Sequence, residues 1–343
     1  MNSLTFVVTN DIHFRAQPPR ARLDDFTAAL SAKVMEVFSI AQKAMADGII
    51  ISGDLTDTPH LGFAAVAELA LLLSKSPCEI FTVAGQHDEH GHSPASLART
   101  PYGLLRKIGI IRDVAEAPSH RLLGERVVAI TGRHYNDDAD RAEDYYEVPE
   151  IALQWAWDSP EKTGAKRPMT IIHIAHGCVV EREPGYEMRC TPIDRLKTSA
   201  SVLCLGDYHP GTGIRRLNNE ANTLTINVGA LARLSAGAAD MERTVQVALL
   251  QVDEDGDVSA KAVPLTSAKP GHEVLSRLHL EQQAQREERM TKFLDLLAAE
   301  GELTFLEVTQ IVEDLARREN IPPEIVKEAL QRIGKARENM GVA

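Results

Sequence analysis

The sequence contains little of the material from which disulfide-rich, membrane-spanning or exported proteins are built. Its 343 residues include only four cysteines and no CxxC pair, so neither a disulfide framework nor a thiolate zinc site is expected. No apolar run approaches the ~20 residues that a membrane-spanning helix needs. The chain enters a strand-like segment at residues 4–9 without a basic stretch or a cleavage site. We therefore expect a cytoplasmic protein whose thiols are reduced and lie in its core.

An excess of basic charge is also absent. The sequence has 37 lysines and arginines against 49 aspartates and glutamates, a net charge of −12. Proteins that coat DNA by themselves usually carry the opposite sign, because phosphate contacts supply most non-specific affinity. Action on a nucleic acid would therefore depend on a local site, on metal ions or on a partner. With 44% hydrophobic and 25% charged residues, the chain is typical of soluble globular proteins, which excludes global disorder.

Short β-branched runs alternate with helical patterns in the first part of the chain. After the strand at 4–9, residues 24–46 carry apolar side chains at steps of three and four, which predicts an amphipathic helix. A buried strand follows at 48–52, and this alternation indicates a layered α/β fold. We further predict a helix at 64–74, strands at 79–84, 126–131, 169–175, 201–205, 223–228 and 244–252, and a turn at 253–257.

The pattern changes after Pro264. Helices are predicted at 273–299, 304–318 and 322–338, the last of them opened by two prolines. We place the boundary near residue 268, with an α/β domain at 1–267 and a helical C-terminal region at 268–343. Two interpretations of this region remain open, a cap that packs on itself and a segment that docks on a partner.

Five short segments rich in aspartate and histidine each follow a predicted strand, where an α/β fold gathers its active-site residues. In an extended segment, side chains two positions apart point the same way and can share one ion. A glycine allows the sharp turn that delivers a carboxylate at a strand end. Each segment alone is more often an ordinary loop, but the set of five predicts a metal site. The segments are Asp11-Ile12-His13, Gly53-Asp54, Gly85-Gln86-His87-Asp88, His176-Gly177 and Gly206-Asp207-Tyr208-His209.

In this order the segments resemble the motifs of the calcineurin-like metallophosphoesterases, and residues 4–265 carry the resemblance. Within that superfamily, residues 128–135, 172–180 and 227–231 are most similar to SbcD/Mre-type DNA repair nucleases and their phage relatives. The resemblance implies a four-layer α-β-β-α sandwich, followed here by the helical tail.

The resemblance also implies a site for two divalent metal ions. The implied ligands are Asp11, His13 and His209 for one ion, Gln86, His176 and Asp207 for the other, and Asp54 as the bridge between them. Within the motifs, Gln86 stands where the family has asparagine, and Asp207 where it usually has histidine. Because carboxylate oxygens suit harder ions, we expect Mn²⁺, with Mg²⁺, Fe²⁺ and Zn²⁺ as alternatives.

Three neighbours of these ligands receive separate interpretations. The resemblance implies that His87 contacts the phosphate and protonates or steadies the leaving oxygen. Asp88 would orient His87 and keep it charged. Tyr208, between two ligands, is interpreted as a packing residue.

The function implied by the resemblance is that of a two-metal phosphodiesterase, an SbcD-like DNA exonuclease and endonuclease subunit that uses a hydroxide bridging the ions. The implied partners are DNA, bound weakly by this chain alone, an SbcC-like coiled-coil ATPase and a second copy of the chain, with no membrane. One alternative is a metallophosphatase or phosphodiesterase for nucleotides or other small phosphoesters. A second alternative is a non-catalytic scaffold with an altered metal site, motivated by Gln86 and Asp207.

Overall fold

The computed structural model describes residues 3–150, 152, 169–278, 286–287, 289–292, 305–318 and 321–339. The chain divides into two compact units, Met1–Arg277 and Leu278–Ala343. The sequence placed the boundary of its two predicted domains ten residues earlier, near 268, and that division into functional domains stays a prediction. Within the described residues, no helix has both the length and the apolar character needed to cross a membrane.

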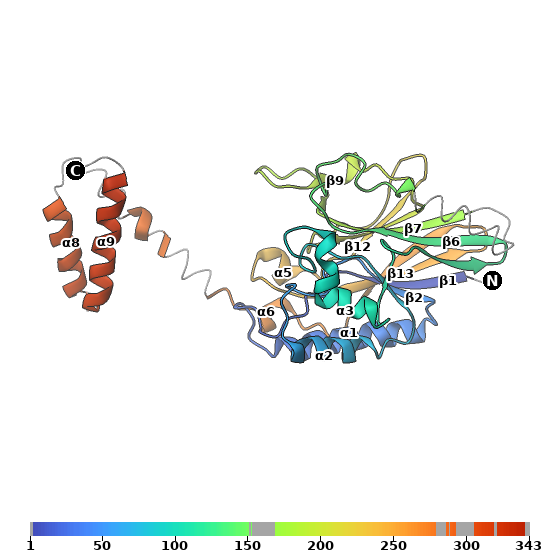
Figure 1. Cartoon of the computed structure of the whole chain (residues 1–343), viewed down its shortest axis with the longest axis horizontal. Coiled ribbons are helices and arrows are strands. Elements are labelled where there is room, and N and C mark those ends of the chain that lie inside the picture. Colours follow the sequence, from blue (N-terminus) through green and yellow to red (C-terminus); the bar gives the residue numbers. More distant parts are fainter. Residues whose placement is uncertain are drawn as a thin grey trace. The chain divides into compact units, whose positions relative to one another are not determined.

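Two six-stranded mixed sheets form the centre of the first unit (Figure 1). In the first sheet β1 to β4 run parallel, while β13 runs antiparallel to β1 and β14 antiparallel to β13. In order across this sheet the strands are β14 (Val258–Pro264), β13 (Gln246–Asp253), β1 (Ser3–Thr9), β2 (Gly48–Ile51), β3 (Ile80–Thr82) and β4 (Arg112–Asp113).

The second sheet has four parallel strands between two antiparallel edge strands. Its order is β11 (Gly213–Arg216), β12 (Leu224–Asn227), β10 (Val202–Asp207), β7 (Met169–Gly177), β6 (Arg126–Arg133) and β5 (Ser119–Leu123). A small separate ladder joins β8 (Val179–Val180) to β9 (Thr191–Pro192).

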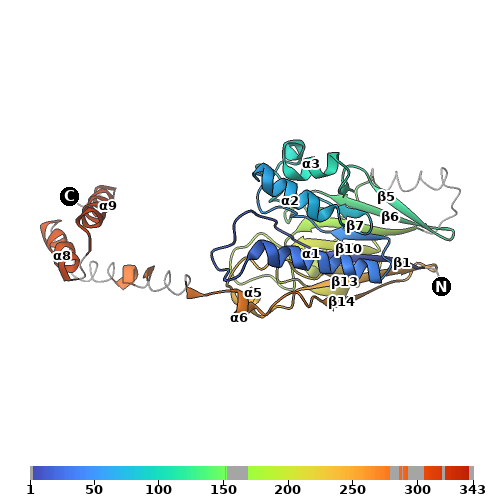
Figure 2. The ribbon, with the colours of Figure 1, turned by 90° about the horizontal axis from the view of Figure 1, so that it is seen from below.

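Helices cover the outer face of the first sheet (Figures 1 and 2). The larger ones are α1 (Phe26–Lys43) and α2 (Phe63–Leu73), whose apolar sides pack in one core cluster with β1 and β2. Shorter elements of this unit are η1 (Pro94–Arg99), α3 (Pro101–Lys107), η2 (Ile193–Arg195), α5 (Ala238–Glu242) and α6 (Gly271–Val274).

The central strands are buried on both faces, which explains their continuous apolar runs. In β2, Ile49 and Ile51 belong to the core beneath α1 and α2, whereas Ile50 belongs to the core between the two sheets. This division follows from the alternation of side chains along a strand. Tyr145 and Tyr146 are buried in a third cluster, together with Ala175 of β7 and Leu203 of β10. The predicted α/β sandwich is confirmed.

The prediction of a helix at 273–299 is wrong for the first residues of that range. α6 ends at Val274, and Leu275 is extended and 3% exposed. Leu275 forms a β-bridge with Arg22, and Ser276 donates from its backbone to the Ala21 carbonyl. Pairing with residues 21–23 therefore replaces the helix, because it buries Leu275 on the first unit. Residues 279–285, 288 and 293–304 of the predicted helices lie outside the described residues.

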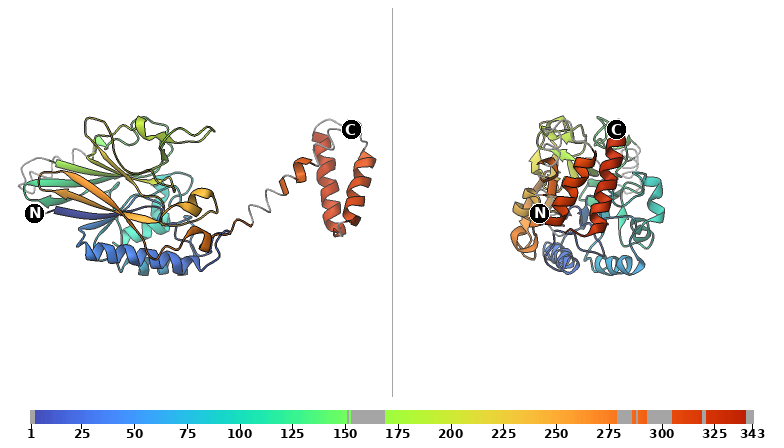
Figure 3. Two further views of the ribbon diagram at one scale, coloured as in Figure 1. Left: turned by 180° about the vertical axis from the view of Figure 1, so that it is seen from behind. Right: turned by 90° about the vertical axis from the view of Figure 1, so that its left-hand side faces the viewer.

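The second unit contains the predicted C-terminal helices as α8 (Phe305–Arg318) and α9 (Pro323–Asn339). They lie side by side in Figures 1 and 3 and contact each other. Ala316 is buried, whereas Ile311, Leu315 and Ile325 are 40%, 53% and 54% exposed. Both interpretations of this region from the sequence therefore stay open.

Lys33 lies on the buried side of α1 and is 3% exposed. Its Nζ donates to the Leu231 carbonyl at 2.6 Å. Burial, reinforced by nearby arginines, lowers the pKa of Lys33 to about 7. An unfolded lysine has a pKa of about 10.4, so between pH 7 and 10 the unfolded state binds more protons. We expect the free energy of unfolding to rise with pH in this window by more than it does in Lys33→Met, as measured by urea unfolding.

The matched control is Lys43→Met, which removes an exposed lysine from the last turn of the same helix. Its pH profile should follow that of the wild type. Parallel profiles for Lys33→Met and the wild type would show that Lys33 has an ordinary affinity for protons in the folded state.

Candidate metal centre

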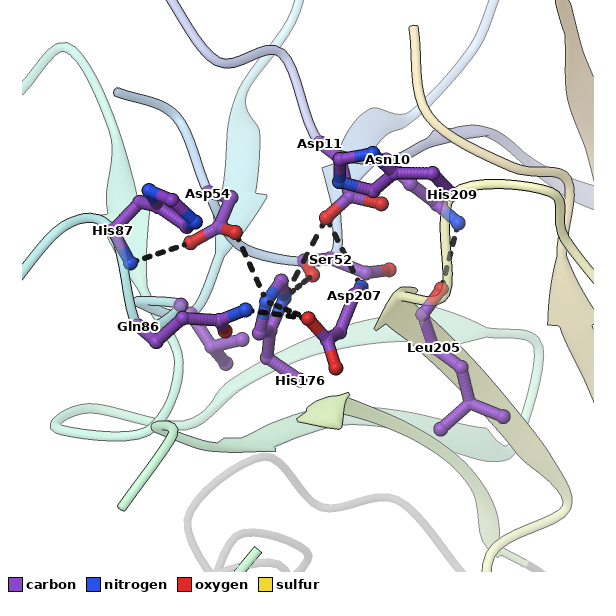
Figure 4. A network of polar contacts seen from close by, with 12 residues as sticks. Asn10, Asp11, Ser52, Asp54, Gln86, His87, His176, Leu205, Asp207 and His209 are labelled. Atoms are coloured by element: carbon purple, nitrogen blue, oxygen red, sulfur yellow. Dashed lines mark hydrogen bonds and ion pairs between the residues drawn. The ribbon is translucent and has the colours of Figure 1, made fainter. Parts of the chain in front are cut away.

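All five predicted motifs meet at one place, where the carboxyl ends of parallel strands from both sheets face each other (Figure 4). Asp11 and His13 follow β1, Asp54 follows β2, and Gln86 and His87 follow β3 in the first sheet. From the second sheet, the ends of β7 and β10 supply His176 and Asp207, and His209 follows directly. Neighbouring parallel strands end at the same edge of a sheet. Residues that follow these strands therefore become neighbours, even when they are nearly two hundred positions apart in the sequence.

The first predicted ligand group is compact. Asp11, His13 and His209 each offer one atom within 4.8 Å of the others. The Nε2 atoms of His13 and His209 are 3.0 Å apart. Two imidazole nitrogens this close, with no acceptor between them, either share one proton or bind one cation.

Asp54 lies between the two predicted ligand groups. Its Oδ2 is 3.6 Å from His13 Nε2 and 3.3 Å from His176 Nε2. Its Oδ1 accepts a hydrogen bond from the His87 backbone N–H at 2.9 Å. One oxygen therefore fixes the carboxylate and leaves the other facing both groups, which is the arrangement a bridging ligand requires.

His176, from the second predicted group, lies close to Asp11 of the first. Asp11, Asp54 and His176 offer atoms within 4.8 Å of each other, whereas Asp207 Oδ1 is 4.0 Å from His176 Nε2. His176 Nδ1 donates to the Ser52 carbonyl at 2.6 Å, which directs Nε2 toward the cluster. Asp207 donates from its backbone to Asp11 Oδ1 at 3.1 Å. The assignment of individual ligands to one ion or the other stays a prediction.

Gln86 reaches the same cluster through its amide. Its Nε2 donates to Asp207 Oδ1 at 2.5 Å, and its Oε1 has no hydrogen-bond partner. The hydrogen bond orients the amide so that its oxygen remains unused. The longer side chain, compared with asparagine, thus brings the Gln86 amide into contact with the carboxylate of Asp207.

The role predicted for Asp88 is not the one its contacts support. Its carboxylate accepts from the backbone N–H groups of Leu55, Thr56 and Gly85 and from the Thr56 hydroxyl. It thus holds the loops after β2 and β3 together. His87 is oriented instead by Asp57, whose carbonyl oxygen lies 2.8 Å from His87 Nδ1. Neighbours in the chain need not have neighbouring side chains, and here they point apart.

The electrostatics of His87 favour its charged form. Burial lowers the pKa of its imidazole, but the Asp54 carboxylate, the Asp57 carbonyl and the Asp57 carboxylate together raise it above its usual range. The Asp57 carboxylate also pairs with Arg15 at 3.0 Å and lies 3.5 Å from His13 Nδ1. Sequence reasoning missed Asp57, although its place three residues after Asp54 was a visible signal.

The backbone is strained where it presents the ligands. Eight non-glycine residues of the described part of the chain have positive φ, and four of them are predicted ligands: Asp11, His13, Asp54 and Asp207, with φ of 46°, 47°, 48° and 79°. Such conformations cost free energy and persist only when the surrounding structure imposes them. Their concentration here separates the cluster from ordinary loops.

Glycines make room for His176. Gly53 has a φ of 92°, and a Cβ at this position would overlap the His176 ring. At Gly85 a Cβ would overlap the Asp54 carboxylate. The predicted sharp turn at Gly53 is therefore present, and close approach of backbone to imidazole is a second reason for its glycine.

The sequence also did not predict the structural role of Asn10. Its Nδ2 donates to the Leu205 carbonyl at 2.7 Å and to Asn227 Oδ1 at 2.9 Å. These bonds tie the end of β1 to β10 and β12 in the other sheet, directly behind Asp11. A buried amide with partners 195 and 217 residues away has no local signature in the sequence.

The donor atoms left over suit a divalent cation. Sixteen buried side-chain nitrogen and oxygen atoms of the described residues have no hydrogen-bond partner. Five belong to predicted ligands: Asp11 Oδ2, His13 Nδ1, Asp54 Oδ2, Gln86 Oε1 and His176 Nε2. Buried polar atoms are normally paired, so this concentration needs an explanation. Carboxylate, amide and imidazole donors together suit Mn²⁺, Mg²⁺, Fe²⁺ or Zn²⁺.

The pKa values of the buried carboxyl and imidazole groups in the cluster also favour a bound cation. Burial raises the pKa of Asp11 to about 8 and lowers that of His13 to about 3. For Asp54, burial favours the neutral form, but His176 and His13 hold its pKa well below the usual range. A cation shared by these groups would stabilise ionised carboxylates beside neutral imidazoles. The residues therefore fit divalent metal ions.

The match to a protein-family model agrees with this fit. The family model described as calcineurin-like phosphoesterase matches residues 4–211, so the chain belongs to the calcineurin-like phosphoesterase family, whose members use divalent metals. A comparison with curated proteins found no match.

Among solved structures, the chain is similar to a dimetal phosphatase from Danio rerio, with 11% identity over 76% of this chain and 96% of that one and a TM-score of 0.47. It is also similar to the calcineurin-like phosphoesterase YfkN from Bacillus subtilis, with 14% identity over 83% and 97% and a TM-score of 0.42. A third similar structure is TT1561 of Thermus thermophilus, with 12% identity over 76% and 99% and a TM-score of 0.41. The finer resemblance to SbcD/Mre-type nucleases stays a prediction.

Proposed function

We propose that this protein is a two-metal phosphodiesterase that hydrolyses DNA. The observation that carries the chemistry is the set of unpaired donor atoms of Asp11, Asp54, Gln86 and His176 at the meeting point of the two sheets. The choice of DNA rests on the resemblance of residues 128–135, 172–180 and 227–231 to SbcD/Mre-type nucleases.

The residues divide the work as follows. Asp11, His13 and His209 would hold one ion, Gln86, His176 and Asp207 the other, with Asp54 between them. Two bound ions supply a lowered pKa for an attacking water and neutralise charge on the phosphate. Ser52 orients His176, and Gln86 orients Asp207. His87, held by the Asp57 carbonyl at Nδ1, would donate a proton to the leaving oxygen from Nε2.

The identity of the metal follows from the carboxylate of Asp207. A third carboxylate in the cluster, beside Asp11 and Asp54, favours Mn²⁺ over Zn²⁺ because hard oxygen donors suit hard ions. We further propose that a coiled-coil ATPase supplies DNA affinity, since a net charge of −12 opposes binding of DNA by this chain alone.

The test is metal-dependent hydrolysis by the purified full chain. We expect Mn²⁺ to support release of nucleotides from end-labelled DNA and turnover of bis-p-nitrophenyl phosphate, both faster than with Zn²⁺. Asp54→Asn, prepared in parallel, should abolish both activities and so exclude a contaminating nuclease.

Three outcomes would contradict the proposal. Turnover of small diesters or cyclic nucleotides without any cleavage of DNA would favour the small-molecule alternative. Turnover of monoesters only would indicate a phosphatase. Binding of fewer than one ion per chain, with no hydrolysis of any ester, would favour the non-catalytic scaffold.

A further inference from the structure

A pocket of about 370 Å³ lies beside the candidate metal centre. One wall is the segment that follows β7 and β8, and the other includes Tyr208. Its lining includes Val180, Arg182, Pro184, Tyr186, Met188 and Tyr208. We propose that this pocket binds the nucleobase of a nucleotide whose phosphoester occupies the metal centre. This inference rests on the proposed function and names the part of the substrate that the chain recognises.

Both walls of the pocket belong to segments that carry predicted ligands. Tyr208 stands between Asp207 and His209, and its Cα is therefore about 3.8 Å from that of each. On the other wall, β8 begins three residues after His176, and Cys178 forms a β-bridge with Asp207. A phosphate at the metal centre would therefore lie within a nucleotide's length of the pocket.

Tyr186 presents an aromatic face that the fold does not use. It is 71% exposed, and Met188 beside it is 38% exposed. The Tyr186 hydroxyl contacts Met188 Sδ at 3.8 Å, so the phenol and the thioether are neighbours. Clustered exposed apolar groups on a soluble protein usually mark a binding site. Flat aromatic rings and polarisable sulfur are the surfaces on which nucleobases and other planar rings stack.

The charge at the rim suits a nucleotide. Glu181 is paired with Arg215, so its carboxylate is compensated. For Arg182, by contrast, the described residues provide neither a hydrogen bond nor an ion pair. A free guanidinium can stack on a base or bind a phosphate oxygen.

The size of the pocket suits one ring system. A volume of about 370 Å³ lies near the lower end of the ~300–1,000 Å³ that is typical of small-molecule sites. Tyr208 is only half-buried as part of this wall. The interpretation of Tyr208 as a packing residue therefore gives way to a role as one face of the pocket.

The experiment compares esters that differ only in the group that remains on the phosphate. Thymidine 5′-(p-nitrophenyl) phosphate, methyl p-nitrophenyl phosphate and decyl p-nitrophenyl phosphate all release p-nitrophenolate. We expect Tyr186→Ala to lower kcat/KM for the thymidine ester by about tenfold, since base stacking contributes ~1–3 kcal/mol. Values for the methyl ester should stay within twofold of the wild type.

Two further variants separate stacking from damage to the fold. Tyr186→Phe keeps the ring and should keep the preference for the thymidine ester. Leu71→Ala removes another exposed apolar side chain, on α2 and 67% exposed, and should change neither ester.

The possible failures are distinguishable. If the wild type hydrolyses none of the three esters with any divalent metal, the proposed function fails. If it hydrolyses all three and Tyr186→Ala affects the thymidine and methyl esters equally, only the nucleobase pocket is refuted. A loss confined to the decyl ester would assign the pocket to an alkyl chain and would also refute it.

Discussion

Replacing Asp54 by asparagine is expected to remove bound metal and activity together. The carboxylate is fully buried, and its free Oδ2 faces His13 and His176 at 3.6 and 3.3 Å. Asparagine keeps the shape but removes the negative charge that would hold two cations close together. After Mn²⁺ loading and desalting, metal analysis should fall from two ions per chain to fewer than one. Hydrolysis of bis-p-nitrophenyl phosphate should fall by ~10³-fold or more. This is at least the loss in rate seen when an enzyme loses one group that stabilises charge in the transition state.

Glu68→Gln is the matched control for this change. Glu68 is exposed on α2, and the substitution likewise converts one carboxylate into an amide. Its metal content and rate should equal those of the wild type. Two retained ions in Asp54→Asn, with a rate within tenfold of the wild type, would remove Asp54 from the bridging position.

Replacing His87 by alanine is expected to lower turnover while leaving the metals in place. The contact of His87 with Asp54 is made by its backbone N–H, which alanine retains. Loss of a general acid typically costs ~10²–10⁴-fold. The loss should be greatest for dinucleotide substrates, whose alkoxide leaving group needs a proton, and smallest for p-nitrophenyl esters, whose leaving group hardly needs one. Rates for both substrates, measured beside metal content, check this expectation.

The geometry also defines the contrary result, in which His87 is itself a metal ligand. His13, Asp57 and His87 also offer atoms within 4.8 Å of each other, as a small metal site would require. If His87 were a ligand, His87→Ala would lose metal and would slow both kinds of ester alike. His272→Ala, which removes an exposed histidine from α6, is the control for the loss of an imidazole elsewhere.

The strands that the sequence failed to predict are mostly edge strands. β11 and β5 carry exposed polar side chains, as in the Gly-Ile-Arg-Arg of β11, and lack the apolar run of a strand buried on both faces. Edge strands are commonly polar because their outer side faces water. β1, β2 and β10 are buried along nearly their whole length and were predicted from their apolar runs alone.

Side-chain direction was predictable only where the backbone is regular. On β7, the alternation of a strand turns His173, three residues before His176, to the opposite face, and its Nδ1 lies 2.8 Å from Thr131 Oγ1. Asp88 lies in a turn, where the alternation of a strand no longer applies, and the partner inferred for it was wrong. The same limit hid the pocket wall formed by Tyr208.

By itself, the sequence determined the residue types of the cluster and their places at strand ends. It could do so because apolar runs locate the strands, and glycine, aspartate and histidine mark the turns after them. Only the tertiary structure decided which donor atoms stay free, since the atoms that occupy the others come from distant parts of the chain. Ser52 engages His176 across 124 residues, and Gln86 engages Asp207 across 121. Hydrogen bonds over such separations depend on how the two sheets pack, and no local pattern encodes them.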